Sequence, residues 1–168
     1  CRFKHYNAHQ KATRLVNHPG IYQFNDMIQG QVICDKALAE EDFIIHRKDG
    51  LFAYQLAVVA DDIFQNISHV IRGCDLLEPT TRQLSFFKTL NACAPKYGHV
   101  PLAITADGYK LSKQNKAPAI DTQHPQPTLI KALTFLQQQP PNALVDGTVD
   151  EIIHWGIQHW SKDKIANM

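Results

Sequence analysis

The sequence lacks several features that mark particular classes of protein. No apolar run approaches the roughly 20 residues that a transmembrane helix needs, so we expect no membrane partner. The first residues, Cys1 to His5, hold neither an apolar signal segment nor an initiator Met, and we expect the chain to begin inside a longer protein. The net charge is only +1, so any surface that binds nucleic acid must be local.

Closely spaced cysteines are also absent, and this spacing excludes a complete zinc site within these 168 residues. The four cysteines are Cys1, Cys34, Cys74 and Cys93, and none lies two to four residues from another. Cys34 and Cys74 stand in apolar surroundings and are predicted to be buried, reduced thiols. Free thiols of this kind indicate a reducing compartment, the cytoplasm.

What the sequence does contain is enough apolar material for a core, with 44% hydrophobic residues. Residues 20–24 alternate in polarity, 31–34 follow a glycine, and 43–46 form a short apolar run, so we predict short strands and turns up to about residue 45.

From Leu51 the apolar period becomes helical, and a well-buried helix is predicted over 51–63. A strand over 69–72 follows, then a helix from Thr80 to about Leu90 that Pro79 opens, and then a strand over 99–104. Asp107-Gly108 predicts a turn.

This order of strands and helices is typical of an α/β fold with a parallel sheet, and resembles half of a doubly wound fold. Ligands of such folds bind beyond the carboxyl ends of the strands. Arg72 and the lysine-rich segment after Ile104 both follow predicted strand ends, which is the first indication of a site.

The end of the chain has a different pattern. Residues 128–136 are amphipathic, and Thr148 with Glu151 predicts a capping box that begins a second helix. We therefore predict a small helical unit after a boundary near residues 116–125.

The segment from Tyr109 to Lys116 holds three lysines and no acidic residue. Lysine ammonium groups, the Ser112 hydroxyl and backbone amides can together bind a polyphosphate. On composition alone, a solvated basic loop remains the alternative.

Lys110-Leu111-Ser112-Lys113-Gln114 resembles the KMSKS signature of class I aminoacyl-tRNA synthetases. The stretches 47–62, 69–73 and 99–108 are similar to the corresponding segments of the members that activate glutamate. The resemblance implies that the signature residues bind ATP, with Lys110 and Lys113 catalytic, as a carboxylate attacks the α-phosphorus. It also implies that Tyr54 and Arg72 bind glutamate. The alternatives for these two are a core aromatic for Tyr54, and for Arg72 an ion pair with Asp61, Asp62 or Asp75.

Within this family, residues 113–119 look like the branch that transfers glutamate to queuosine in the anticodon loop of tRNA(Asp). The resemblance implies an α/β fold in three parts. They are the end of a connective, zinc-binding insert with β structure (1–45), the second half of a Rossmann-like catalytic domain (46–118) and a short helical tail (119–168).

The resemblance further implies a cytoplasmic, monomeric ligase that uses glutamate, ATP, Mg²⁺ and tRNA(Asp) carrying queuosine, with Zn²⁺ in the full-length protein. Cys1 falls at the position of the last zinc ligand. This fragment is expected to be inactive alone, because the histidine motif of the first catalytic half is missing from it. A fragment of a glutamyl-tRNA synthetase, and a non-catalytic paralogue that binds tRNA or nucleotide, remain the alternatives.

Overall fold

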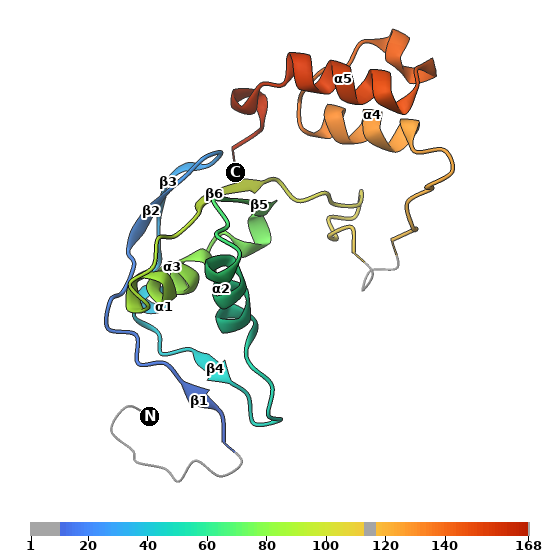
Figure 1. The fold of residues 1–168 in the computed structure, drawn as a ribbon. Helices are drawn as coiled ribbons and strands as arrows, with labels where there is room; N and C mark the ends of the chain where they lie inside the picture. The colour runs from blue at the N-terminus through green and yellow to red at the C-terminus, as the bar shows by residue number, and fades with distance from the viewer. Residues whose placement is uncertain (1–10, 113–116, 168) are drawn as a thin grey trace. The chain divides into compact units, whose positions relative to one another are not determined.

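The computed structural model describes residues 11–112 and 117–167 (Figure 1). The chain divides into two compact units, residues 1–99 and 100–168. None of the helices in the described ranges is long and apolar enough to cross a membrane.

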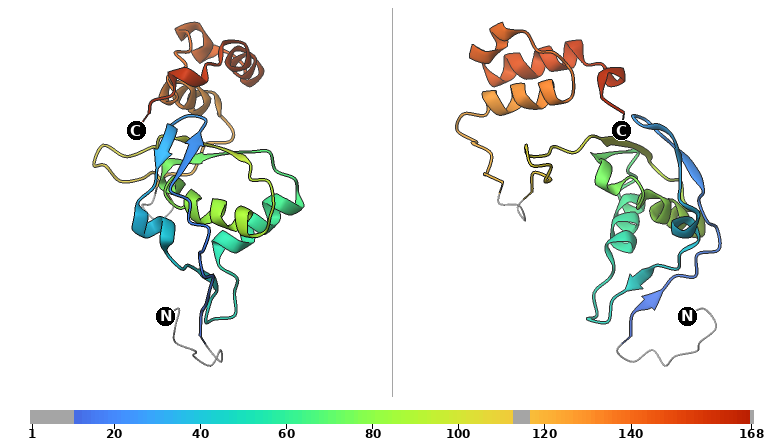
Figure 2. Two further views of the ribbon diagram at one scale, coloured as in Figure 1. Left: turned by 90° about the vertical axis from the view of Figure 1, so that its left-hand side faces the viewer. Right: turned by 180° about the vertical axis from the view of Figure 1, so that it is seen from behind.

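The described residues of the first unit form short strands and α-helices (Figures 1 and 2). The strands are β1 (Thr13–Arg14), β2 (Gln23–Asp26), β3 (Gly30–Ile33), β4 (Ile44–His46), β5 (His69–Gly73) and β6 (Lys96–Val100), the last of which reaches the boundary. The helices are α1 (Lys36–Glu40), α2 (Tyr54–Phe64) and α3 (Thr80–Thr89). The predicted order of strands and helices after residue 43 is thus confirmed.

The strands pair two by two. β1 is antiparallel to β4, β2 is antiparallel to β3, and β5 pairs with β6. The prediction that β4 joins the two later strands in one parallel sheet is therefore wrong for the part of the chain that is described. The backbone explains the difference, because the Leu15 amide donates to the Phe43 carbonyl at 2.9 Å and draws the β1 segment alongside β4.

Two further sequence predictions need correction. The last strand covers 96–100 and not 99–104, because Pro101 has no amide hydrogen with which to extend the ladder. The helix α2 is less buried than its apolar pattern suggested. Val59 is fully buried, but Tyr54 and Phe64 are 55% and 86% exposed.

The core of this unit brings together β4, α2 and α3. It consists of Phe43, Val59, Phe86 and Phe87, and the rings of Phe43 and Phe86 meet edge to face at 5.0 Å. This core holds the elements that carry the candidate site.

The turn of the β2–β3 hairpin packs against β6. The Met27 amide donates to the Tyr97 carbonyl at 2.8 Å. Gly98 permits this approach, because a Cβ there would lie 3.3 Å from Cε of Met27 and 3.4 Å from Cδ1 of Ile28. The hairpin turn is thereby placed next to the strand that follows α3.

The second unit contains α4 (Gln126–Phe135) and α5 (Val149–His159), which pack against each other. The predicted capping box is confirmed: the Thr148 hydroxyl accepts from the Glu151 amide, and the Glu151 carboxylate accepts from the Thr148 amide. After α4, the buried amide of Gln138 bonds both backbone groups of Ser161, which ties the end of α5 to the end of α4.

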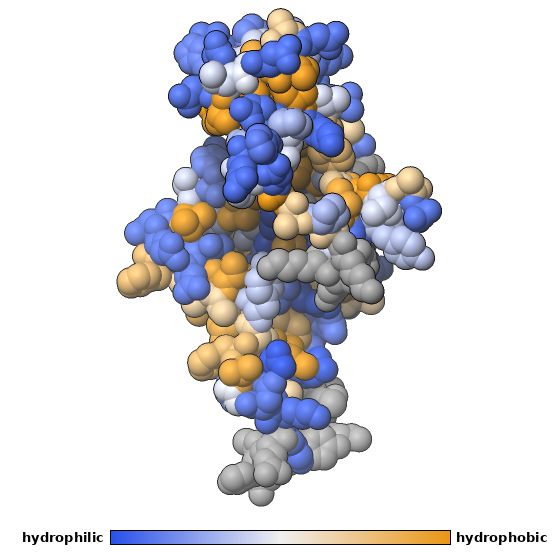
Figure 3. Space-filling model, turned by 90° about the vertical axis from the view of Figure 1, so that its right-hand side faces the viewer, coloured by the Kyte–Doolittle hydropathy of each residue, from blue (hydrophilic) through white to orange (hydrophobic). Residues whose placement is uncertain are grey.

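An apolar groove lies between these two helices. Its lining includes Leu129, Leu133, Ile153, Ile157 and Trp160. Apolar and polar residues alternate in patches over the face drawn in Figure 3.

The three described cysteines carry free thiols. Cys74 is buried, as predicted, whereas Cys34 is only half-buried and Cys93 is exposed. The prediction of a buried thiol at Cys34 is therefore wrong, because the strand β3 that precedes it carries mostly exposed side chains.

Candidate functional site

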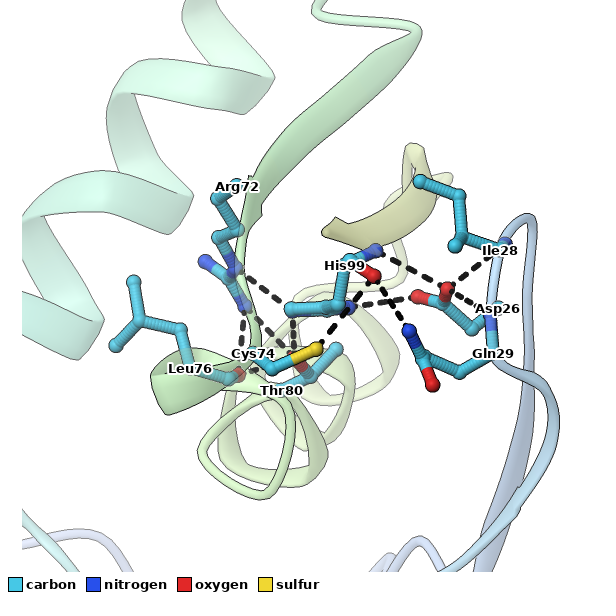
Figure 4. A network of polar contacts seen from close by, with 8 residues as sticks. All are labelled: Asp26, Ile28, Gln29, Arg72, Cys74, Leu76, Thr80 and His99. Atoms are coloured by element: carbon cyan, nitrogen blue, oxygen red, sulfur yellow. Dashed lines mark hydrogen bonds and ion pairs between the residues drawn. The ribbon is translucent and has the colours of Figure 1, made fainter. Parts of the chain in front are cut away.

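Arg72, near the carboxyl end of β5, is held by several hydrogen bonds (Figure 4). Its Nε donates to Nε2 of His99 at 3.0 Å, and its Nη2 donates to Oγ1 of Thr80 at 2.7 Å and to the Leu76 carbonyl at 3.3 Å. Within residues 11–112 and 117–167, Nη1 makes no hydrogen bond. The half-buried guanidinium thus keeps two N–H groups for a ligand.

The guanidinium also stacks on an aromatic ring. Its Cζ lies 5.0 Å from the centroid of Tyr97, and this ring is nearly parallel to that of His99, with centroids 6.2 Å apart. Tyr97 and His99 are two residues apart on β6 and share one face of the strand. One face of β6 therefore supports Arg72 both by stacking and by hydrogen bonding.

Tyr54 and Arg72 both influence the pKa of one buried hydroxyl, that of Tyr97. Burial, Asp62 and Tyr54 raise the pKa of Tyr97 to about 12, and the positive charge of Arg72 opposes the rise. Tyr54 begins α2 and is too exposed to be a core aromatic. Both residues thus affect the pKa of the same hydroxyl, and their role in binding glutamate stays a prediction.

Ion pairs with the nearby carboxylates do not explain how the Arg72 guanidinium is held. Burial raises the pKa of Asp62, the charge of Arg72 opposes this, and Asp61 adds to it. The hydrogen bonds that hold the guanidinium go instead to a ring nitrogen, a hydroxyl and a carbonyl. Arg72 is therefore anchored by acceptors other than carboxylates, which leaves its charge available to an anion.

Behind Arg72 lies a buried pair that the sequence analysis missed. Oδ2 of Asp26 is 2.6 Å from Nδ1 of His99, and both side chains are fully buried. Oδ1 of Asp26 accepts from the amides of Ile28 and Gln29, each at 2.9 Å, and from the His99 amide at 3.1 Å. A histidine between apolar strand residues was the available signal, but its partner on a distant hairpin left no local pattern.

Burial alone would raise the pKa of Asp26, but hydrogen bonds from the Gln29 amide, the His99 side chain and the Ile28 and His99 amides outweigh it and hold the pKa below its usual value. The carboxylate is therefore ionised at neutral pH although it is buried.

The lysine-rich loop lies in the second unit. Lys110 and Leu111 are exposed and Ser112 is half-buried, whereas Lys113 and Gln114 fall outside the described residues. The turn predicted at Asp107-Gly108 is confirmed: Gly108 has φ +82°, and backbone bonds join Thr105 to Tyr109 and Ala103 to Leu111. This narrow turn presents Lys110 to solvent.

A metal site is not visible in the described ranges. They contain no group of three or more His, Cys, Asp or Glu residues that could hold an ion. Cys1, the predicted zinc ligand, lies outside those ranges. The described residues therefore do not fit a zinc site.

The Tyr97 hydroxyl gives a test of the packing under Arg72. It is buried and has no hydrogen-bond partner among the residues that the structure describes. Tyr97→Phe keeps the stacked ring and removes an unsatisfied group, so we expect the free energy of unfolding to rise by about 1 kcal/mol. Denaturant unfolding measures this change. Tyr22→Phe, which removes an exposed hydroxyl bonded to Glu40, is the control and should change little. A clear loss of stability in Tyr97→Phe would show that the buried Tyr97 hydroxyl is hydrogen-bonded, which would contradict the prediction.

The lowered pKa of Asp26 predicts an acid-sensitive fold. Because its pKa is lower in the folded than in the unfolded state, ionised Asp26 stabilises the fold fully above the unfolded value of about 3.9. This contribution is lost as the pH falls through the folded pKa. Asp26→Asn should therefore be less stable than wild type near pH 7, and the difference should narrow below about pH 4. Unfolding curves at several pH values measure this difference in stability.

Asp121→Asn is the control, because Asp121 is an exposed acid with a lowered pKa. Its stability should differ from that of wild type much less at pH 7. Equal differences for both variants would contradict the prediction.

The family model described as "tRNA synthetases class I (E and Q), catalytic domain" matches residues 4–133. The Glutamyl-Q tRNA(Asp) synthetase of Colwellia psychrerythraea is 63% identical over 170 residues, which cover 98% of this chain and 54% of that protein. The protein of the same name from Photobacterium profundum is 48% identical and covers 100% of this chain and 54% of its own length.

Among solved structures, the glutamate-tRNA synthetase from Elizabethkingia anophelis is similar, with a TM-score of 0.64 at 22% identity. The match covers 90% of this chain and 34% of that one, and it supports the predicted α/β fold of a class I catalytic domain. The chain spans about half the length of the curated relatives it matches.

Proposed function

Because the chain belongs to the glutamate and glutamine (E and Q) family of class I tRNA synthetases, we propose that the full-length protein activates glutamate with ATP and transfers it to queuosine in tRNA(Asp). The observation that carries this proposal is the 63% identity, over nearly the whole chain, to a protein named Glutamyl-Q tRNA(Asp) synthetase. The similarity of residues 113–119 to that branch gives further support.

The first step is the formation of an adenylate. An oxygen of the glutamate carboxylate attacks the α-phosphorus of ATP, the bond to the β-phosphate breaks, and pyrophosphate leaves. Arg72 offers its two Nη1 N–H groups, which diverge from one nitrogen, to separate acceptor oxygens of glutamate, and Tyr54, whose side chain is exposed, also acts on the hydroxyl of Tyr97, the residue on which Arg72 stacks. Their role is to bind and orient glutamate.

The lysine-rich loop acts on the other substrate. Lys110 and Lys113 stabilise the negative charge that develops on the phosphate oxygens, and Leu111, Ser112 and Gln114 complete the ATP-binding segment. Mg²⁺ bound with ATP would add further positive charge at the phosphates. On the resemblance alone, Cys1 contributes to a zinc site in the longer protein, which functions in the cytoplasm as a monomer.

In the second step, a hydroxyl of the queuosine cyclopentene ring attacks the carbonyl carbon of the adenylate, and AMP leaves. The anticodon loop of tRNA(Asp) must then enter the active site itself. The basic loop offers a local surface for its phosphates, and such contacts weaken steeply with salt.

The test is the transfer of radiolabelled glutamate by the full-length protein. We expect label on tRNA(Asp) that carries queuosine and none on tRNA(Asp) with guanosine at the same position. The guanosine form is the matched control, because it keeps every other contact. Label on tRNA(Glu), with none on queuosine-containing tRNA(Asp), would overturn the proposal and favour a glutamyl-tRNA synthetase.

A further inference from the structure

The contacts of Arg72 define which of its donors can meet a ligand. A guanidinium carries five N–H groups, and here the Nε hydrogen and both Nη2 hydrogens are directed to His99, Thr80 and Leu76. Rotation of the guanidinium would break these three bonds together. The direction of the two remaining hydrogens, on Nη1, is therefore set by the acceptors on the opposite edge.

His99 is the acceptor whose chemical state can vary. Arginine can only donate, so Nε2 of His99 must carry a lone pair toward Nε of Arg72. The single ring proton then sits on Nδ1 and is donated to Oδ2 of Asp26. The opposite tautomer would place two donors against each other at Arg72.

The carboxylate of Asp26 in turn is held in one orientation. Three backbone amides, those of Ile28, Gln29 and His99, hold Oδ1, and this leaves Oδ2 directed at the imidazole. A carboxylate only accepts, so its fixed position selects the Nδ1–H tautomer. A continuous chain of hydrogen bonds thus connects the hairpin turn, the imidazole of His99 and the guanidinium of Arg72 (Figure 4).

We propose that Asp26 and His99 are positioning residues for glutamate binding: Asp26 fixes the tautomer and ring orientation of His99, and His99 aims the free edge of Arg72 at a substrate carboxylate. This inference rests on the proposed role of Arg72 in glutamate binding. Neither residue touches the substrate. Their effect is to keep the Arg72 side chain ordered before glutamate arrives, which lowers the entropy cost of binding.

A purely structural role would have different consequences. A buried ion pair or polar pair seldom stabilises a fold more than well-packed apolar residues do. If the pair served only the fold, its loss would lower stability and the amount of active protein, while the KM for glutamate in the remaining folded protein would not change.

The most specific test uses Asp26→Asn in the full-length protein. If the carbonyl oxygen of the asparagine takes the place of Oδ1, its NH2 group takes the place of Oδ2 and donates a hydrogen bond to Nδ1 of His99. Nδ1 must then accept, so the ring proton moves to Nε2. The Nε2–H group now faces the Nε–H group of Arg72, and the hydrogen bond between them is lost. We expect the KM for glutamate to rise roughly 10-fold, the scale of losing one pre-ordered side chain, while the KM for ATP changes less than about twofold. Pyrophosphate exchange measures both constants.

Two substitutions of His99 separate the contacts of its two ring nitrogens, Nδ1 with Asp26 and Nε2 with Arg72 and Thr80. In His99→Asn the amide reaches the position of Nδ1 and serves Asp26 alone, so glutamate binding should weaken as in Asp26→Asn. In His99→Gln the amide oxygen reaches the position of Nε2 and can accept from Arg72, so it should recover much of the affinity. His124→Asn is the matched control, because His124 also pairs with an aspartate, Asp121, but at an exposed site. It should leave both constants unchanged.

The ring nitrogen of His99 that carries the proton can also be determined directly in the wild-type protein. Nitrogen chemical shifts distinguish the two tautomers, and we expect the proton on Nδ1 at neutral pH. A proton on Nε2 would overturn the proposal without any variant, even if the substituted proteins failed to fold.

Arg72→Lys separates failure of this inference from failure of the proposed function. If Arg72→Lys leaves the KM for glutamate unchanged, the glutamate site is misplaced and the inference falls with it. If Arg72→Lys raises that KM but Asp26→Asn and His99→Asn match the His124→Asn control, Arg72 binds glutamate and the positioning role alone is wrong.

Discussion

Arg72→Ala is expected to lower kcat/KM for glutamate in the full-length protein by about 100-fold or more. Hydrogen bonds to charged groups contribute about 1.5–3 kcal/mol each, and two are available from Nη1. Since about 1.4 kcal/mol corresponds to a factor of ten, their joint loss has this magnitude. Pyrophosphate exchange at varied glutamate concentration measures the effect.

The control for this experiment is Arg82→Ala on α3. Arg82 pairs with Glu41 at the surface and lies outside the polar network around Arg72. Its loss should change kcat/KM by no more than about twofold, as for other surface ion pairs. A similar fall in both variants would show that general destabilisation, and not glutamate binding, caused the effect at Arg72.

Phe87→Ala is expected to lower the free energy of unfolding by about 3–5 kcal/mol. Phe87 is 2% exposed and belongs to the core that joins β4, α2 and α3. Whole domains are stable by only about 5–15 kcal/mol, so much of the protein should unfold under mild denaturant. The midpoint of denaturant unfolding, followed by circular dichroism, measures the loss.

Phe64→Ala is the matched control, since this phenylalanine at the end of α2 is 86% exposed. We expect a change within about 0.5 kcal/mol, as for most surface substitutions. If Phe64→Ala cost as much as Phe87→Ala, the exposed ring would have to be covered in the full-length protein.

Local chemistry made several elements predictable from the sequence. The capping box of Thr148 and Glu151 and the Pro79 start of α3 depend on residues a few positions apart, and the structure confirms both. Tyr54 and Arg72 were assigned to glutamate binding through the family resemblance alone, and this assignment stays a prediction; the structure shows the Arg72 guanidinium stacked on Tyr97.

The sequence could not reveal which strands pair or which side chains meet across the fold. The apolar run from His99 to Ile104 looked like one strand, and only Pro101 indicated where it ends. No sequence pattern singled out Asp26, because its role depends on a histidine in another part of the chain. Periodicity reports which face of an element is apolar, but not what that face contacts.

The distance along the chain between Asp26 and His99 has a kinetic consequence. They are 73 residues apart, so the hydrogen bond between them closes a long loop. Contacts of such separation carry a large loop-closure entropy, and folding slows as they come to dominate. Helices α2 and α3 can gain structure from local contacts, but the setting of Arg72 cannot, since it needs the hairpin docked on β6. Competence to bind substrate is therefore expected to arise late in folding, after most of the secondary structure of this unit has formed.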